Sequence, residues 1–207
     1  MDPGYLSSPV RDSVRKKKHP TQPWQPLHEK AYAHIRQALM TGQYRPGRRI
    51  TLRELADSIG VSAMPVRDAV RRLIAEGAVE VRSTRYVQVP LMTTARLAEL
   101  RDIRVELETL AVTRAIERLT GDDIKSLRAI AEQIASARQR HDTTTDMRKI
   151  REFHYSLYAA SDLPYLTRLL DNVWTLTGPY LNLLFPHYTH TNKGLTLRTQ
   201  LVQALEY

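Results

Sequence analysis

The sequence predicts a mainly α-helical protein in two parts, an N-terminal winged helix-turn-helix and a C-terminal all-α helical bundle. Apolar residues recur every three or four positions through most of residues 27–75 and 93–207, which is the period of an amphipathic helix. Between these regions, AVEVR and YVQVP alternate valines with other residues and indicate a short β-hairpin. Residues 1–92 carry 16 Lys or Arg and 8 Asp or Glu, whereas residues 93–207 carry 15 and 14. This excess of positive charge in the first part favours a polyanionic partner.

Residues 1–26 are expected to form a flexible basic arm, because they contain several prolines and the run RKKK but no apolar periodicity. They also lack the apolar core of a signal peptide, and no stretch of the chain is long and apolar enough to span a membrane. The absence of cysteine excludes disulfides and thiolate metal sites. We therefore expect a cytoplasmic protein that does not associate with membranes.

Residues 27–92 are expected to form a DNA-binding domain of three helices and a basic hairpin. The first helix carries Tyr32, Ile35 and Leu39 at helical spacing and ends at Gly42. Its apolar stripe would pack against the two helices that follow.

The second and third helices have recognisable start signals. TLRE, at Thr51, has the form of a capping box with Glu54, and Gly60 closes that helix. The third helix begins at Ser62, a favourable N-cap residue. Pro65 then lies in the first turn, where its missing N–H costs no helical hydrogen bond.

The third helix is expected to bury one side and expose the other. The apolar side consists of Val66, Ala69, Val70, Leu73 and Ile74, and the exposed side carries Ser62, Met64, Arg67 and Arg71. An arginine at the front of such a helix can bond phosphate or bind guanine bidentately in the major groove. The alternative is a solvated face with internal ion pairs, for which Asp68 and Arg72 have the i,i+4 spacing.

The segment ITLRELADSIGVSAMPVRDAVRRLIAEGAVEV closely resembles the DNA-binding domain of GntR-family bacterial transcription regulators. The resemblance implies DNA contacts from the start of the second helix, the front of the third and the tip of the wing. Together with Arg71, the expected DNA-binding residues are Arg53, Ser62, Met64, Arg67, Arg82 and Arg85. Ala63 stands where the family often has arginine, and Tyr86 stands where it has a wing-tip glycine that permits close approach to the DNA backbone.

Residues 93–207 are expected to form a helical effector-binding and dimerisation domain. Its helices are predicted over about residues 94–119, 122–140, 147–160 and 164–185, with a fifth beginning near Leu195, and RHDTTTD is predicted to be a loop. RVELE and EFHYSLYAASDLPYL resemble motifs of the FCD domain found in FadR-like GntR regulators. That resemblance implies a further helix beyond the position where this chain ends, so we expect a bundle lacking its last helix, as a shortened variant or a fragment.

Many FCD domains bind a divalent metal through an aspartate four residues before the histidine of this motif and through later histidines. Here the histidine is His154, but the aspartate position is Ile150 and a later ligand position aligns with Arg198. We therefore expect no family-type metal site and no cofactor. The pair His187 and His190 has ligand spacing only if it is helical, and neighbouring Pro186 favours a loop.

A cavity for a small effector is still implied by the resemblance, with Arg104, His154, Tyr158 and Tyr180 as candidate lining residues. Arg104 would suit a carboxylate, such as an organic acid. The alternative for Arg104 is a structural ion pair with Glu108, and His154 could equally be a hydrogen-bonded core residue.

The function expected from the resemblance is that of a sequence-specific transcription regulator, a repressor that binds a pseudo-palindromic operator in double-stranded DNA as a homodimer. The alternative is a nonspecific nucleic-acid-binding or architectural protein whose bundle only dimerises. The chain has no phosphate-binding loop and no GxSxG motif, so we do not expect an enzyme.

Overall fold

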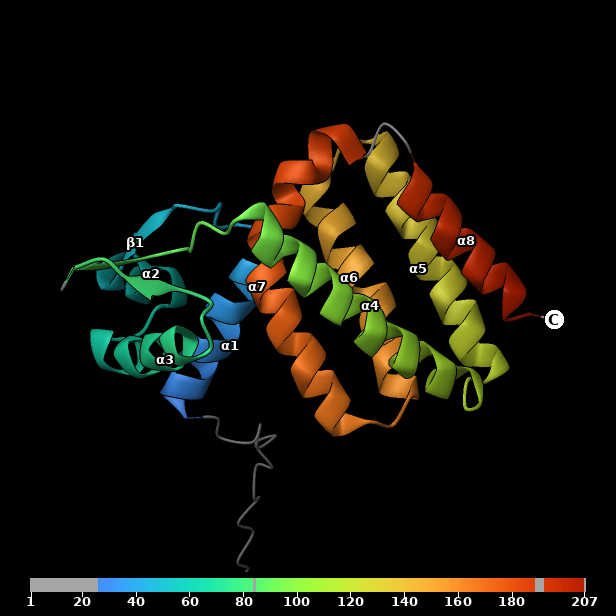
Figure 1. Cartoon of the computed structure of the whole chain (residues 1–207), viewed down its shortest axis with the longest axis horizontal. Coiled ribbons are helices and arrows are strands. Elements are labelled where there is room, and N and C mark those ends of the chain that lie inside the picture. The colour runs from blue at the N-terminus through green and yellow to red at the C-terminus, as the bar shows by residue number, and fades with distance from the viewer. Residues whose placement is uncertain (1–25, 84, 189–191, 207) are drawn as a thin grey trace, which may run out of the picture.

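The computed structural model describes residues 26–83, 85–188 and 192–206, so the predicted N-terminal arm lies almost entirely outside the described residues. An N-terminal head is followed by a helical bundle, which is the predicted fold class (Figure 1). The head consists of α1 (Leu27–Met40), β1 (Arg49–Thr51), α2 (Leu52–Ile59), α3 (Ala63–Ala75), β2 (Glu80–Val81) and β3 (Tyr86–Gln88). The bundle consists of α4 (Thr94–Ile116), α5 (Gly121–Gln139), α6 (Thr143–Ala160), α7 (Pro164–Tyr188) and α8 (Lys193–Ala204).

Helix α2 begins and ends as predicted, although only half of its capping box is present. The Thr51 side chain accepts a hydrogen bond from the Glu54 N–H, and Gly60 ends the helix in the left-handed conformation. The Glu54 carboxylate does not bond back to Thr51, because it accepts a hydrogen bond from Arg48 at 2.8 Å.

Helix α3 buries the side that the sequence predicts, with Val66, Ala69, Val70 and Leu73 in the head core. Ser62 is its N-cap residue but makes no capping hydrogen bond through its side chain. The predicted pair between Asp68 and Arg72 is wrong. Arg72 instead lies over the Tyr32 ring, 3.7 Å from its centroid, and pairs with Glu76 and Glu29 because this side of α3 faces α1.

The wing contains one strand more than the predicted hairpin. β1 pairs antiparallel with β3 and places Ile50 opposite Val87, so the strand order is β1-β3-β2. A three-residue segment with a single apolar residue has too little alternation to predict a strand. Val81 was expected to share the alternation of Val79, but it is 59% exposed whereas Val79 is buried.

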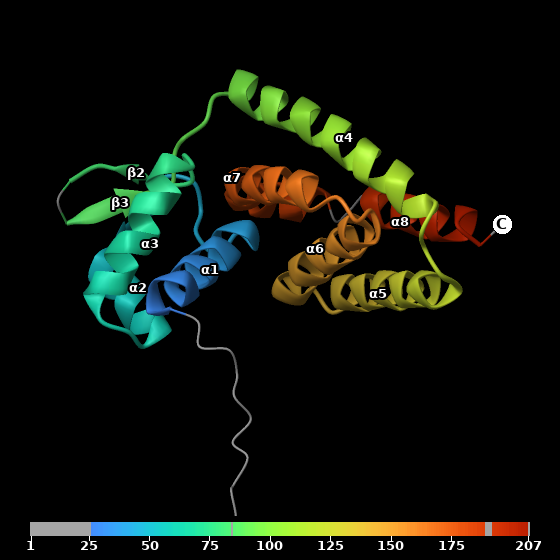
Figure 2. The ribbon, with the colours of Figure 1, turned by 90° about the horizontal axis from the view of Figure 1, so that it is seen from below.

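The bundle helices follow the predicted order, with small shifts at their starts. α4 is capped by Thr93, where the sequence favoured Thr94. α6 begins at Thr143 because Asp142 caps it by accepting from the Thr145 N–H, so most of the predicted RHDTTTD loop is helical. Figure 2 shows α4 along one side of the bundle and the α5–α6 hairpin on the other. No helix in the described ranges combines the length and apolarity that crossing a bilayer requires.

The head and the bundle meet where α1 packs against α7, as Figures 1 and 2 both show. A Cβ atom on Gly178 of α7 would lie 2.4 Å from the Leu39 carbonyl oxygen and 2.6 Å from the Met40 Cα, so only glycine permits this approach. Met40 of α1 belongs to the bundle core, and Leu176 of α7 packs against the head core. The two parts therefore interlock.

Candidate DNA-binding surface and bundle polar cluster

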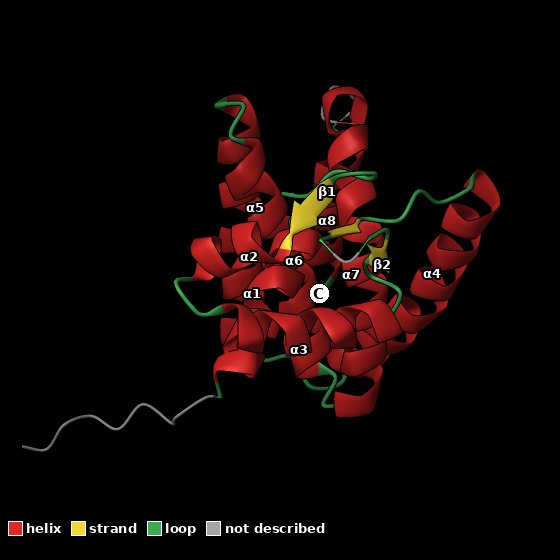
Figure 3. Ribbon diagram, turned by 90° about the vertical axis from the view of Figure 1, so that its left-hand side faces the viewer, coloured by secondary structure: helices red, strands yellow, loops and turns green. Residues whose placement is uncertain are grey.

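The seven predicted DNA-binding side chains are all exposed on the head, which faces the viewer in Figure 3. Met64 is 68% exposed at the front of α3, although a large apolar side chain is normally buried. Residue 84, at the wing tip, lies outside the described residues. The exposed set consists of Arg53 from the start of α2, Ser62, Met64, Arg67 and Arg71 from α3, and Arg82 and Arg85 from the wing.

Some of the exposed arginines form ion pairs with neighbouring carboxylates, whereas Arg67 forms none with the residues described. Arg53 and Arg71 lie 3.8 Å and 3.4 Å from Asp57 and Asp68, pairs weak enough to exchange for phosphate. Arg67 forms no side-chain hydrogen bond or ion pair with any residue that the structure describes. Its guanidinium is therefore available to an external acceptor.

The wing departs from the family pattern at Tyr86, and the structure shows what the tyrosine does there. Tyr86 is the first residue of β3, and Arg49 of β1 lies over its ring, 5.2 Å from the centroid. Arg82 is held by Glu80 at 2.7 Å. Tyr86 therefore begins the central strand of the sheet, and its ring contacts Arg49 of the neighbouring strand β1.

A group of polar side chains converges inside the bundle, and we call it the Glu108 cluster: Arg104 and Glu108 of α4, His154 and Tyr158 of α6, and Trp174 of α7. Arg104 Nε donates to Glu108 Oε1 at 2.8 Å, and its guanidinium lies 3.9 Å from the Trp174 ring centroid. The Tyr158 O–H also donates to Glu108 and accepts from the Trp174 N–H at 3.0 Å. Glu108 thus receives two hydrogen bonds in a partly buried site.

Charge and burial together set the ionisation of the Glu108 cluster. Burial alone would raise the pKa of Glu108, but the positive charge of Arg104 and the hydrogen bonds donated by Tyr158 and Arg104 favour the carboxylate, and the pKa of Glu108 is lowered. Burial, helped by Arg198 and Arg104 and opposed by Glu108, lowers the pKa of His154 to about 3. His154 is therefore neutral, with Nδ1 3.5 Å from Glu108 and Nε2 3.3 Å from Arg198.

Three of the four candidate effector residues, Arg104, His154 and Tyr158, meet in this cluster. Tyr180 does not, because its O–H donates to the Pro90 carbonyl at 2.8 Å and accepts from the Met92 N–H, which ties α7 to the linker before α4. The alternative Arg104–Glu108 ion pair is present. Sequence reasoning did not find Trp174, for which neither motif nor spacing gave a signal.

Two of the positions at which FCD domains hold a metal carry Ile150 and Arg198 in this chain. Ile150 is 7% exposed in the bundle core, and Arg198 directs its guanidinium at His154. Within the described part of the chain, no three His, Asp or Glu side chains are grouped so as to hold an ion. The loop predicted around Pro186 and His187 is wrong, because α7 continues as a helix to Tyr188. The His187 side chain and His190 lie outside what the structure describes, so the expectation that this pair holds no metal stays a prediction.

Two family models match the chain. The model of the bacterial regulatory proteins of the gntR family matches residues 27–89, and that of the FCD domain matches residues 99–206. The chain belongs to the GntR family. It is a DNA-binding transcription regulator of the FCD-containing subfamily and, like the other regulators of this family, is not an enzyme.

Relatives of this GntR-family regulator agree with that assignment. It is 32% identical over 151 residues to the HTH-type transcriptional regulator McbR of Escherichia coli (strain K12), a match spanning 73% of this chain and 68% of McbR. It is 30% identical over 151 residues to the uncharacterized HTH-type transcriptional regulator YdhC of Bacillus subtilis (strain 168), spanning 72% and 66% of the two chains.

Solved structures support the fold. The structure of E. coli McbR/YncC superposes on the regulator with a TM-score of 0.83 at 28% identity, covering 88% of this chain and 87% of the other. A putative GntR regulator from Rhodococcus sp. RHA1 has a TM-score of 0.57 at 22% identity, covering 86% and 93%, and shares the fold.

Proposed function

We propose that this regulator binds a pseudo-palindromic operator in double-stranded DNA as a homodimer and represses transcription there. A small effector that binds the bundle changes the affinity of the regulator for this operator. The observation that carries the proposal is the front of α3. Arg67 is exposed there and has no side-chain partner among the described residues, while Val66 and Val70 behind it are buried in the head core. A helix anchored in this way can present Arg67 to base edges in a fixed orientation.

Arg67→Ala is expected to reduce the preference for operator over random DNA about 10–100-fold, because a bidentate contact to guanine contributes about 1–3 kcal/mol of discrimination. Competition binding with the DNA upstream of the regulator's own gene would measure this preference. Lys125→Ala, which removes an exposed charge from α5 in the bundle, is the control and should leave the preference unchanged.

The alternative function, nonspecific or architectural DNA binding, makes the opposite prediction. Random DNA would then compete equally with the upstream region for the wild-type protein, and Arg67→Ala would lower affinity for both DNAs alike. That outcome would reject the proposed operator recognition.

The homodimer is supported by the outer surface of α4. Large apolar side chains stay exposed along this helix, although α4 packs on α6 and α7: Ile103 (42%), Val105 (53%), Leu110 (45%) and Ile116 (53%). Exposed apolar surface of this kind suits contact with a second copy. Two symmetry-related α3 helices would then reach half-sites about one turn of DNA apart.

Leu110→Lys is expected to shift the protein from dimer to monomer, because a lysine ammonium would be desolvated at the α4 contact. Sedimentation velocity measures the change. Val81→Lys, which replaces an equally exposed apolar residue of the wing, should leave the dimer intact. A wild-type protein that sediments as a monomer at all accessible concentrations would contradict the proposed dimer.

The effector is proposed to be a small molecule, such as an organic acid, that contacts Arg104, His154 and Tyr158. Since Glu108 already pairs with the Arg104 Nε, an acid bound to Arg104 would compete with the Glu108 carboxylate for the guanidinium charge. Repression is supported by two relatives in E. coli, GlaR and RspR, which are named transcriptional repressors and are each 22% identical to this chain.

A further inference from the structure

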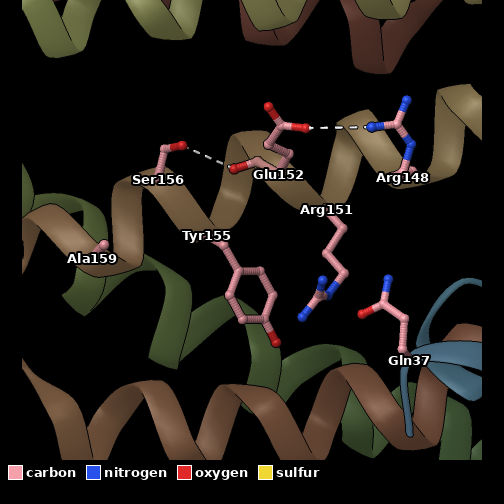
Figure 4. A pocket seen from close by; sticks show the side chains of 7 residues that line it. All are labelled: Gln37, Arg148, Arg151, Glu152, Tyr155, Ser156 and Ala159. Carbon is pink, nitrogen blue, oxygen red and sulfur yellow. Dashed lines mark hydrogen bonds and ion pairs between the residues drawn. The ribbon is translucent and has the colours of Figure 1, made fainter. Parts of the chain in front are cut away.

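An open groove with a volume of about 530 Å³ lies where α1 of the head meets α6 of the bundle (Figure 4). Its volume falls within the range of pockets that hold small molecules, about 300–1,000 Å³. One lining residue comes from α1 and the others from successive turns of α6: Gln37, then Arg148, Arg151, Glu152, Tyr155, Ser156 and Ala159. The groove is separate from the Glu108 cluster, with which it shares no residue.

Arg151 is the side chain in this groove whose charge is least compensated. Its guanidinium lies over the Tyr155 ring, 4.2 Å from the centroid, and extends toward Gln37 in Figure 4. Its Nε is buried without a hydrogen-bond partner, and no carboxylate in the described ranges pairs with it. A buried donor without a partner is unfavourable, so an acceptor that enters the groove and reaches it is favoured.

Asp171 of α7, a half-buried carboxylate that contacts Tyr155, is already paired with other groups. It accepts the hydrogen bond of the Tyr155 O–H and pairs with Arg36 of α1 at 3.2 Å. Arg36 also donates from Nε to the Thr175 hydroxyl at 3.0 Å. These contacts hold α1, α6 and α7 together, and among the described residues no ion pair joins Asp171 to Arg151.

The rim of the groove is also positive. Glu152 is the one carboxylate among the seven described lining residues, and Lys149 holds it at 2.8 Å. Arg148 lies 4.0 Å from the same carboxylate, at the outer limit of an ion pair. Arg148 and Arg151 therefore give the groove an excess of positive charge that favours an anion.

We propose that this groove binds a small molecule carrying a carboxylate or phosphate group, with the Arg151 guanidinium as its bidentate anchor and the Gln37 amide as a contact from the head. Because Gln37 lies on α1 and Arg151 on α6, the ligand would span the joint between the head and the bundle. The ligand would also change the affinity of the protein for its operator, a consequence that rests on the proposed function. The size of that change equals the difference between the ligand's affinities for the DNA-free and the DNA-bound protein.

Calorimetric titration of the full chain tests the site without DNA. Citrate, succinate, benzoate and inorganic phosphate are titrated at equal ionic strength, so that the carboxylate and phosphate arms are compared directly. At least one probe should bind once per chain, with affinity reduced at least about tenfold in Arg151→Gln, since a charge-assisted bidentate contact is lost. Arg151→Lys, which keeps the charge but not the planar fork, should lose affinity to a smaller extent.

Arg168→Gln is the matched control, because Arg168 also lies over a tyrosine ring, 5.5 Å from the Tyr165 centroid, but is exposed on α7 outside the groove. It should bind the probe as the wild type does. Failure of all four probes to bind, or equal affinity in Arg151→Gln and the wild type, would overturn the site. If Arg151→Gln does not fold, the comparison of Arg151→Lys with Arg168→Gln decides.

Operator titration with and without the bound probe tests the coupling separately. An operator affinity that changes with the probe in the wild type but not in Arg151→Gln supports coupling through the joint. An unchanged affinity overturns the coupling and leaves the site intact. Absence of operator preference under both conditions counts against the proposed function, not against the groove.

Discussion

Asp146→Ala is expected to lower the free energy of unfolding by about 3–5 kcal/mol, the usual consequence of removing one partner of a buried ion pair. Asp146, in the first turns of α6, and Arg138, in the last turn of α5, are 3.0 Å apart and only 1% and 6% exposed. The two remaining Arg138 nitrogens, Nη1 and Nη2, have no hydrogen-bond partner among the described residues. Without Asp146, the Arg138 charge would remain buried and uncompensated.

Chemical denaturation measures this loss, and a double mutant identifies its cause. Arg138→Met combined with Asp146→Leu should recover most of the stability, because the cost arises from an unpaired buried charge and both charges are then removed. Lys125→Met breaks the exposed pair with Asp122 on α5 and should have little effect. A small effect of Asp146→Ala, comparable to that of Lys125→Met, would show that water reaches Arg138.

The second large effect is a loss of stability in acid caused by His154. Its folded-state pKa of about 3 lies below the unfolded value of 6.5, so the unfolded chain binds a proton that the folded chain does not. Stability is therefore fully present above pH 6.5 and falls as the pH is lowered toward 3. Between pH 6.5 and 5.0 one such group accounts for a loss of about 1.5 kcal/mol, with more below that range.

His154→Gln should remove this pH dependence, because glutamine does not titrate and can still bond to both Glu108 and Arg198. Denaturation midpoints at several values between pH 6.5 and 5.0 give the slope. His34→Gln changes an exposed histidine of α1 and should retain the wild-type slope. Equal slopes in His154→Gln and the wild type would mean that His154 is protonated in the folded protein.

Features that depend on local sequence were predictable. Thr51, Ser62 and Gly60 mark helix boundaries because capping involves residues only a few positions apart. The exposure of Arg67 follows from the helical period, because the buried residues Val66 and Val70 lie on the opposite face of α3. The three residues that meet around Glu108 were selected from motifs of the FCD domain, and the structure places them together.

Features that depend on distant contacts were not predictable. Strand β1 exists because β3, more than thirty positions later, pairs with it. Arg72 does not pair with Asp68, because its guanidinium lies over the ring of Tyr32 on α1. Tyr180 is a candidate for the effector site in the sequence, but in the structure its O–H bonds to the linker before α4. The groove at Arg151 results from the meeting of α1 and α6, which no local pattern encodes.

The contact at Gly178 determines how motion can pass between the effector end and the DNA end. Because backbone meets backbone at Gly178, no side chain lies at this point of contact to absorb a tilt of either helix. A rotation of α7 would be transmitted directly to α1 and, through the packing of α1 on α3, to the position of Arg67. In the proposed dimer, the two DNA-binding heads would thereby change their separation without any change inside either head.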